Sequence, residues 1–519
     1  MFPSSFPLMF ILQERRTIMN ITTFLQTASQ FRTIPIVRRF FADTFQPIQL
    51  LMALRDEAAF LLESKDDMSP WSRYSFIGIH PFVSIESDDG KQFFVKEQQQ
   101  VLACTATIQE AFAMMQHHLN VQLLSLDVPF RGGAVGYISY DFISSIEKVP
   151  YHAYNDLQMK IAHFVVCESL FAFDHVKKEL LLIHYVRLTE TDDEAKQAEK
   201  YEAACRKIDE LARKIVHGYD EQAHMMVDPN IPVSFERVYS NMDKQMFYKA
   251  VRNIQTYIAS GDIFQAVLSQ RFAIETPIDG IELYRLLRLL NPSPYLFYLK
   301  LSEEHIVGSS PEKLIQVRNR ELEIDPIAGT RRRGKNEHED AALMNELLHD
   351  PKERAEHYML VDLARNDIGR VAKYGTVRTP QLMQIGKFSH VMHLISKVTG
   401  TLRDDVHPLD ALLAAFPAGT VSGAPKIRAM QIIQELEPTA RNVYAGTIAY
   451  IGFDGNIDSC IAIRTAVLKN KVAYVQAGAG VVADSSPALE WKETRNKASA
   501  LIHAIQLAER VFKGGEQHV

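Results

Sequence analysis

Cysteine is scarce in this sequence, and long apolar runs are absent from it. The four cysteines are far apart, form no Cys-x-x-Cys pair and are too few to frame a secreted disulfide fold. No apolar stretch approaches the ~18 residues that a membrane helix needs. The most apolar run near the start, residues 6–12, has no basic segment before it and no small-residue cleavage site after it. We therefore expect a cytoplasmic protein without a membrane segment.

A strong excess of charge of either sign is also missing. The 57 Lys and Arg residues against 63 Asp and Glu give a net charge of −6, and the pI is near 6.3. This mild acidity argues against a dedicated nucleic-acid binder, which would carry a basic patch or a high pI. With 47% hydrophobic and 23% charged residues, the composition is typical of a globular protein. At about 150 residues per domain, 519 residues fit three to four units or two large ones.

One charged, helix-forming stretch divides the chain. Residues 189–220 have apolar positions at helical spacing, and the loop-like residues that follow place a boundary near residue 235. We predict a disordered extension over 1–18, with Met19 as an alternative start, an N-terminal domain over 19–235 and a second domain over 236–519.

Hydrophobic patterning predicts strands before the boundary and a mixture of strands and helices after it. The expected strands are 71–79, 134–140, 162–173, 180–188, 264–272, 443–452, 458–468 and 471–477. The expected helices are 243–260, 338–348, 350–365 and a long final helix from Pro487. Tight turns join the last three strands, which we interpret as an antiparallel meander. Blocks of strands followed by blocks of helices favour an α+β fold over a βαβ array.

Carboxylates stand at helical spacing in two segments. In 350–367, Asp350 is a good N-cap, Glu353 completes a capping box, and Glu356 shares the face of Glu353. In 478–498, a small-residue strand end leads to a helix that carries Glu490, Glu493 and Lys497 on one face. One glutamate from each of two helices, with a substrate carboxylate between them, would suit Mg²⁺. Taken singly, each pair is more typical of a solvated helix face with nearby Lys or Arg.

Two further residues have both a structural and a functional interpretation. Arg464 is expected on a strand between Ala462 and Ala466, where it either pairs with a buried carboxylate or binds a ligand carboxylate. His393 is either a packed core histidine or a general acid/base. Zinc is excluded because no third ligand stands at a recognised spacing.

Taken together, these segments resemble the chorismate-utilising enzymes, most closely their anthranilate synthase component I branch. The matching stretches, in chain order from about residue 60 to residue 497, are LLES (61–64), NPSPYLFY (291–298), GSSPE (308–312), DPIAGTRRRG (325–334), ERAEHYMLVDLARND (353–367), VMHLIS (391–396), TVSGAPK (420–426), YAGTIAY (444–450), AIRTA (462–466) and GAGVVADSSPALEWKET (478–494). Segment 127–142 (DVPFRGGAVGYISYDF) also resembles the family's N-terminal region, but the sequence gives its Gly and Tyr residues no role beyond turn and strand.

The resemblance implies two orthogonally packed β-sheets with helices on the outside. It implies that ammonia attacks chorismate at C2 and displaces the C4 hydroxyl, after which pyruvate is eliminated to leave anthranilate. Because no Cys-His-Glu amidotransferase signature is present, a separate glutamine amidotransferase subunit should supply the ammonia. The N-terminal half would be regulatory, with tryptophan as the feedback inhibitor.

Residue by residue, the resemblance assigns a site. Glu356 and Glu493 would hold Mg²⁺, His393 would assist the elimination, and Glu312 would protonate the leaving hydroxyl. Arg464 and Tyr444 would bind the enolpyruvyl side, while Gly478, Ala479 and Gly480 would supply backbone donors. The residues expected to line the site are Gly329, Thr330 and Lys497.

Two positions separate the branches of this family. Sister enzymes that make aminodeoxychorismate carry a nucleophilic Lys where this chain has Ala328. Isochorismate and salicylate synthases use a Lys to activate water at a position that aligns with Gln265. The absence of Lys at both positions favours ammonia as the nucleophile. A sister synthase, or a silent tryptophan-binding subunit, remains the alternative.

The tryptophan site would be built around LLES. Glu63 and Ser64 would face the ligand, and the pocket would be completed by Pro294, Tyr295, Leu296, Ile448 and Tyr450. Tyr450 should share a strand face with Tyr444 by period-2 alternation, so that one strand could link the two sites. The alternative is that LLES is an ordinary buried strand end.

Overall fold

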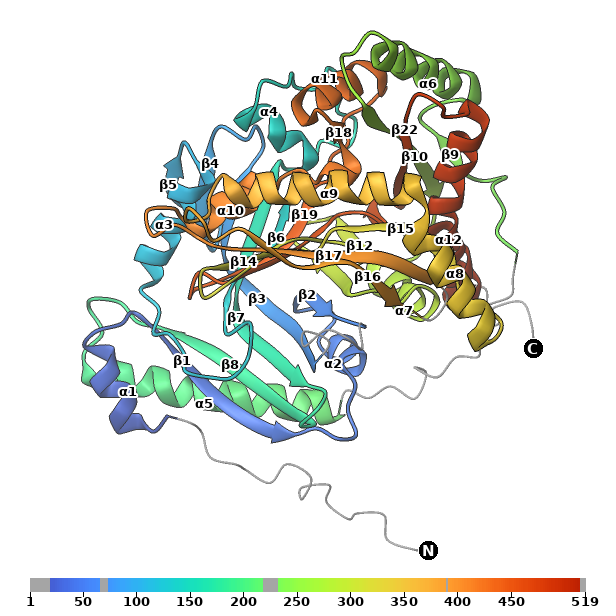
Figure 1. Cartoon of the computed structure of the whole chain (residues 1–519). Helices are drawn as coiled ribbons and strands as arrows, with labels where there is room; N and C mark the ends of the chain where they lie inside the picture. The colour runs from blue at the N-terminus through green and yellow to red at the C-terminus, as the bar shows by residue number, and fades with distance from the viewer. Residues whose placement is uncertain (1–18, 66–72, 218–231, 389–390, 514–519) are drawn as a thin grey trace, which may run out of the picture.

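The computed structural model of the chain describes residues 19–65, 73–217, 232–388 and 391–513. The predicted extension over 1–18 lies outside these residues. Two antiparallel sheets form the centre of the molecule, and helices cover their outer faces (Figure 1).

The first sheet joins strands from both halves of the chain. In order across the sheet, its strands are β9 (Tyr239–Ser240), β10 (Gln265–Glu275), β22 (Val472–Val481), β21 (Thr465–Lys469), β12 (His305–Ser310), β11 (Tyr295–Lys300), β2 (Ala58–Glu63), β3 (Tyr74–Ser87), β7 (Ala162–Asp174), β8 (Glu179–Arg187) and β1 (Thr33–Phe41). The short β18 (Gly423–Ala424) pairs with the start of β10.

The second sheet is centred on a different set of hairpins. Its strands, in order, are β16 (Arg378–Lys387), β17 (Val391–Thr401), β15 (Ile327–Arg332) with β14 (Glu321–Ile324), β13 (Lys313–Arg318), β20 (Ile457–Ile461), β19 (Thr447–Gly452), β6 (Gly133–Ile138), β7, β3, β4 (Phe93–Glu97) and β5 (Gln100–Thr105).

Strands β3 and β7 belong to both sheets. The first part of β3 pairs with β2 in one sheet, and its last part pairs with β4 in the other. Likewise, β7 pairs with β6 over its start and with β8 over its end. A register shift between Pro81 and Val83 marks the passage from one sheet to the other, because a bulge bends and twists a strand.

The sheets enclose an apolar core rich in aromatic side chains, among them Phe60, Tyr137, Phe297 and Tyr450. Helices that pack on the outer face of the first sheet are α1 (Ile21–Ala28), α2 (Pro47–Ala53), α5 (Glu194–His217), α7 (Gly280–Leu290) and α12 (Pro487–Lys513). Those on the second sheet are α3 (Ile108–Leu119), α4 (Ile143–Ile146), α9 (Pro351–Gly369) and α10 (Pro408–Ala415), with α8 (Glu337–His349) beside β17. The helices α6 (Lys244–Ala259) and α11 (Lys426–Leu436) cover the start of β10. The predicted α+β class is confirmed.

The boundary predicted near residue 235 does not divide the sheets. Strand β2, from the N-terminal part, pairs with β11, and β6 pairs with β19. The two halves of the chain are therefore interleaved in both sheets. The described ranges contain no helix long and apolar enough to cross a membrane.

The last strands form the two predicted antiparallel hairpins, β19 with β20 and β21 with β22, but not one continuous meander, because the middle strand is divided in two. Strand β20 ends at Ile461 and pairs within the second sheet, whereas β21 starts at Thr465 and pairs within the first. Arg464 lies at the crossing with φ 50°, not on a strand between Ala462 and Ala466. The alternating apolar pattern runs unbroken through this junction, which is why the sequence predicts one strand.

Tyr444 and Tyr450 do not share a strand face. Tyr444 lies in a turn before β19, and its ring packs under the second sheet, whereas Tyr450 lies in the core between the sheets. Ala445 has φ 63°, so simple alternation cannot be carried from Tyr444 into the strand. The predicted link through one strand face is therefore wrong.

Helix α9 begins as its sequence predicts, with one change. Asp350 accepts hydrogen bonds from the backbone N–H groups of Lys352 and Glu353 at 2.9 and 3.2 Å. Glu353 does not close a capping box; its carboxylate instead pairs with Arg331 at 3.0 Å. This ion pair ties the start of α9 to β15.

Candidate active site

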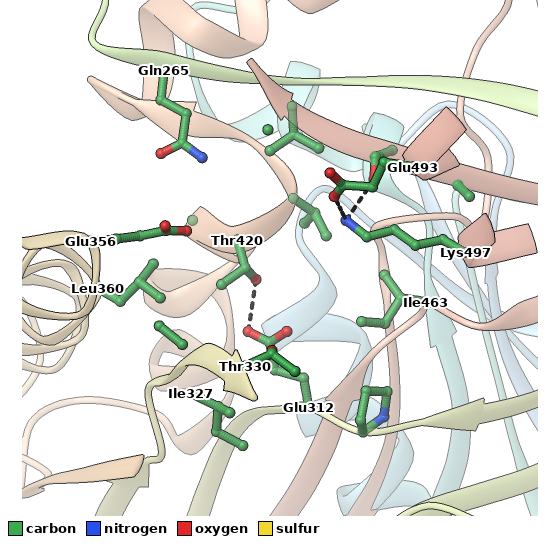
Figure 2. Close-up of a pocket in the computed structure, with 18 of the residues that line it drawn as sticks. Gln265, Glu312, Ile327, Thr330, Glu356, Leu360, Thr420, Ile463, Glu493 and Lys497 are labelled. Atoms are coloured by element: carbon green, nitrogen blue, oxygen red, sulfur yellow. Dashed lines mark hydrogen bonds and ion pairs between the residues drawn. The ribbon is translucent and has the colours of Figure 1, made fainter. Parts of the chain in front are cut away.

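A cavity of about 1710 Å³ opens where α9, α12, β10, β15, β17 and β22 converge. Most of the site residues predicted from the sequence line it: Gln265, Glu312, Ala328, Thr330, Glu356, His393, Tyr444, Arg464, Gly478, Gly480, Glu493 and Lys497. The fold thus brings together segments from both sheets and two helices. Figure 2 shows Glu356 on one side of the cavity, Glu493 and Lys497 on the other, and Glu312 between them.

Carboxylates from two helices face each other across this cavity. Burial and the neighbouring carboxylates of Glu353 and Glu493 raise the pKa of Glu356. The pKa of Glu490 is also raised, by burial and by Glu493. Anionic oxygens that repel one another in this way suit a hard divalent cation. In the described part of the chain, no group of three or more His, Cys, Asp or Glu residues is arranged to hold a metal, so a cation here would need oxygens from substrate or water.

Glu312 is the most deeply buried acid of the site. Burial raises its pKa to about 7, although the hydroxyl of Thr420 donates a hydrogen bond to its Oε1 at 2.7 Å. A carboxyl group with this pKa holds a proton near neutral pH and can deliver it to a leaving group. Thr420 was not singled out by sequence reasoning; its only signal was its place in the TVSGAPK stretch.

The ring of His393 is oriented by the backbone. Its Nδ1 lies 2.9 Å from the carbonyl oxygen of Gly329 and 3.1 Å from Oγ1 of Thr330. Because a carbonyl only accepts, Nδ1 must carry the hydrogen, and the neutral ring keeps its lone pair on Nε2. Gly329 itself does not line the cavity. It has φ 63° at the β15 bulge and presents its carbonyl to the histidine.

Positive charge at the site comes from three side chains that line the cavity, Arg464, Lys497 and Lys352, of which Lys352 lies 3.7 Å from Asp484. Arg464 is largely enclosed, which lowers its pKa, and donates one hydrogen bond to the backbone oxygen of Lys497 at 3.2 Å. Among the described residues no carboxylate forms an ion pair with it, which favours the ligand-binding interpretation over the structural one. Lys497 pairs with Glu493 at 2.6 Å and donates to the carbonyl of Gly478 at 3.0 Å.

Strand β22 borders the cavity. Gly478 and Gly480 line it, whereas Ala479 is fully buried and does not. A Cβ at Gly478 would lie 2.7 Å from the Tyr444 hydroxyl, and one at Gly480 would lie 2.7 Å from Gln265 Nε2. Glycine is needed here because both side chains approach the strand closely.

The residues predicted to bind tryptophan are only partly brought together. The Glu63 carboxylate faces α7, where it accepts a hydrogen bond from Tyr284 at 2.5 Å and lies 3.2 Å from Nε of Arg288. Leu296, opposite Glu63 in the ladder, packs on that same side. Tyr295, Ile448 and Tyr450 instead lie in the core between the sheets, and Pro294 lines the large cavity.

Ser64 follows Glu63 and is placed differently. Its hydroxyl is buried and has no hydrogen-bond partner. Ser64 lies just beyond the end of β2, so strand alternation does not fix its side chain relative to that of Glu63.

This α+β fold, with a charged cavity between its sheets and helices, is that of the chorismate-binding enzymes. The profile of the chorismate binding enzyme family matches residues 57–503, and the chain belongs to this family. The chain is 62% identical over 503 residues to anthranilate synthase component 1 of Bacillus caldotenax (96% of this chain, 99% of the relative). It is 50% identical over 499 residues to that of Bacillus subtilis strain 168 (96% and 97%).

Solved structures agree with these relatives. Anthranilate synthase component I from Streptococcus pneumoniae TIGR4 superposes with a TM-score of 0.73 at 35% identity, over 89% of this chain and 98% of the other. The menaquinone-specific isochorismate synthase from Escherichia coli shares the fold, with a TM-score of 0.68 at 19% identity over 94% and 100% of the two chains. The resemblance predicted from the motifs, to the anthranilate synthase component 1 branch of the family, is confirmed.

Proposed function

We propose that this chain converts chorismate and ammonia to anthranilate and pyruvate, the first committed step of tryptophan biosynthesis. The observation that carries the proposal is one cavity that holds a buried acid, a base with a defined lone pair, cationic side chains and opposed carboxylates. The names of the relatives support the same reaction.

The cavity matches the chemical demands of each step. Chorismate is a dianion, which Arg464 and Lys497 attract, while Tyr444 lies beside the strand that bears Gly478. Ammonia forms a bond to C2 as the C4–O bond breaks, and Glu312 gives its proton to the departing hydroxyl, which leaves as water. Nε2 of His393 then takes the proton from C2 as the C3–O bond breaks. The side chain leaves as enolpyruvate, which takes up a proton on its methylene carbon to become pyruvate. The added nitrogen, left as an ammonium group by the attack, loses a proton to solvent, and the ring becomes aromatic.

Magnesium is part of this proposal. Glu356 and Glu493 would hold the ion, which when bound neutralises the ring carboxylate of the substrate. Two protein carboxylates completed by substrate and water oxygens are the coordination that Mg²⁺ prefers.

Ammonia is favoured over other nucleophiles by what lines the cavity. Ala328 and Gln265 both face it, and neither can act as a nucleophile or as a general base at neutral pH. Ammonia would come from glutamine through a separate amidotransferase subunit in the cytoplasm. Tryptophan would inhibit by binding near Ser64, whose unpartnered buried hydroxyl offers a polar contact in an apolar setting.

The test is anthranilate fluorescence from the purified chain with chorismate, Mg²⁺ and an ammonium salt at alkaline pH. We expect anthranilate, its loss in EDTA, and no product when glutamine replaces ammonium. Chorismate consumed without anthranilate would indicate a sister synthase, and untouched chorismate would indicate a silent subunit. Turnover with glutamine by the pure chain would contradict the separate amidotransferase.

A further inference from the structure

A buried ion pair lies behind the active-site cavity, outside the set of residues that line it. Arg441 is 2% exposed, and its Nε and Nη2 donate to the two carboxylate oxygens of Glu437 at 2.8 and 2.6 Å. Glu437 also accepts hydrogen bonds from the backbone N–H and hydroxyl of Ser269 at 2.8 and 2.7 Å. A bidentate pair whose polar atoms all have partners holds one geometry, and it fixes the position of the groups that it bonds.

The remaining donors of Arg441 reach segments that carry cavity residues. Nη1 donates to the carbonyl of Val421 and Nη2 to that of Val267, both at 2.7 Å. Val421 follows Thr420, the partner of Glu312, and Val267 lies two residues after Gln265 on β10. The guanidinium carbon is also 5.5 Å from the ring centre of Tyr444. One side chain therefore contacts three segments of the site.

The turn that carries Arg441 is held by segment 139–141, in the stretch 127–142 to which the sequence assigns no role. The backbone N–H of Asn442, at φ 53°, donates to Oδ2 of Asp141 at 2.7 Å. The Asn442 carbonyl accepts from the Tyr140 N–H and the Ser139 hydroxyl, both at 2.9 Å. The Tyr140 ring centre lies 4.6 Å from the Arg441 guanidinium.

We propose that Tyr140 and Asp141 are positioning residues for the reaction, which act through Arg441 to place Tyr444, Thr420 and β10 around the substrate. Left-handed backbone at Asn442 does not persist unless its surroundings hold it, and here Asp141 and Tyr140 supply those contacts. The inference rests on the proposed function, because it concerns how that site is placed.

Two pairs of variants test it in the full chain. The Tyr140 hydroxyl has no partner, so Y140F keeps the ring and should match the parent, whereas Y140L removes the ring from Arg441. D141N keeps an oxygen for the Asn442 N–H, whereas D141A does not. We expect Y140L and D141A to lower kcat and raise KM for chorismate, with kcat/KM falling about 100-fold, as misplacement by 1 Å can do. Y140F and D141N should stay within twofold of the parent.

A control separates position from stability. Phe112 is equally buried and packs in the same core, against Phe164, but no residue of α3 lines the cavity. F112L should lower the melting temperature while kcat/KM stays near the parent value. The proposal would be overturned if Y140L and D141A were folded and had kcat and KM within twofold of the parent. It would also be overturned if F112L lost as much kcat/KM as these two variants.

Hydrogen exchange distinguishes failure of this inference from failure of the proposed function. If the parent makes no anthranilate, the proposed function fails and the positioning claim is still measured directly. In Y140L, but not in Y140F, amides of 418–425 and 441–446 should exchange at least tenfold faster than in the parent. Unchanged exchange in both segments would overturn it.

Discussion

Three glutamates face the same cavity in three electrostatic settings. Glu312 is enclosed and accepts one neutral donor, Glu356 faces other carboxylates, and Glu493 pairs with Lys497. The same functional group can therefore serve as a proton donor at one position and as a cation ligand at another.

The acid role of Glu312 gives a pH prediction. Its pKa is about 7, so the protonated form, and the rate at fixed free ammonia, should fall as pH rises above that value. E312Q should lower kcat by about 10²–10⁴-fold and remove this fall in rate from the pH profile. The Thr420 donor stabilises the carboxylate, so T420V should raise the pKa of Glu312 and move the fall in rate to higher pH, while T420S should not. A kcat within twofold of the parent in E312Q would contradict the assignment.

The cation role of Glu356 has a matched control one turn earlier on α9. A ligand present at 100 times its Kd adds about 2.7 kcal/mol to the free energy of unfolding. Mg²⁺ should therefore raise the melting temperature in the presence of chorismate without ammonia. E356Q should lose this rise and need more Mg²⁺ for activity. E353Q, which removes the pair with Arg331 and the negative charge beside Glu356 but leaves the Glu356 carboxylate in place, should keep both responses. An unchanged Mg²⁺ response in E356Q would argue against Glu356 as a ligand.

At the scale of single elements, β2 connects the proposed regulatory residues to β11. Its last residue, Glu63, is held by α7, and the next, Ser64, has a free buried hydroxyl. These two adjacent residues at the end of β2 therefore have different contacts.

This arrangement predicts different effects of two neighbouring substitutions. S64F would overpack the tryptophan site, which costs about 1–3 kcal/mol and corresponds to roughly five- to 150-fold weaker inhibition. E63Q should mainly lower the melting temperature, because it weakens contacts to Tyr284 and Arg288. The measurement is inhibition by tryptophan at fixed chorismate. Unchanged inhibition in an active S64F enzyme would remove Ser64 from the site.

Helices could be predicted from sequence because their signals are local. Asp350-Pro351 and Ser486-Pro487 mark where α9 and α12 begin, and the glutamates follow at fixed helical spacing. The site residues themselves came from the family motifs. Arg464 was misplaced because a crossing between sheets leaves the local apolar pattern unchanged. Thr420 was missed because its partner, Glu312, is far away in sequence.

At the scale of the molecule, neither half of the chain forms a complete sheet on its own. The first sheet needs β2 beside β11, and the second needs β6 beside β19. Removing the N-terminal half would expose the edges of β11 and β19 and open the core between the sheets.

A fragment of residues 236–519 should therefore not fold alone. We expect it to be insoluble, or soluble without a cooperative thermal transition by circular dichroism. Coexpressed 19–235 and 236–519 fragments, which keep every strand, should assemble and recover activity. A lone 236–519 fragment that melts cooperatively would show that the interleaving is dispensable.

The two long strands β3 and β7 also decide where the chain tolerates a change of length. Each serves both sheets. Deleting one residue from the middle of either strand would therefore turn all its later side chains to the opposite face, in the second sheet for β3 and in the first sheet for β7. Insertions and deletions should accordingly survive in the loops between strands and be absent from 74–87 and 162–174, whatever substitutions those segments accept.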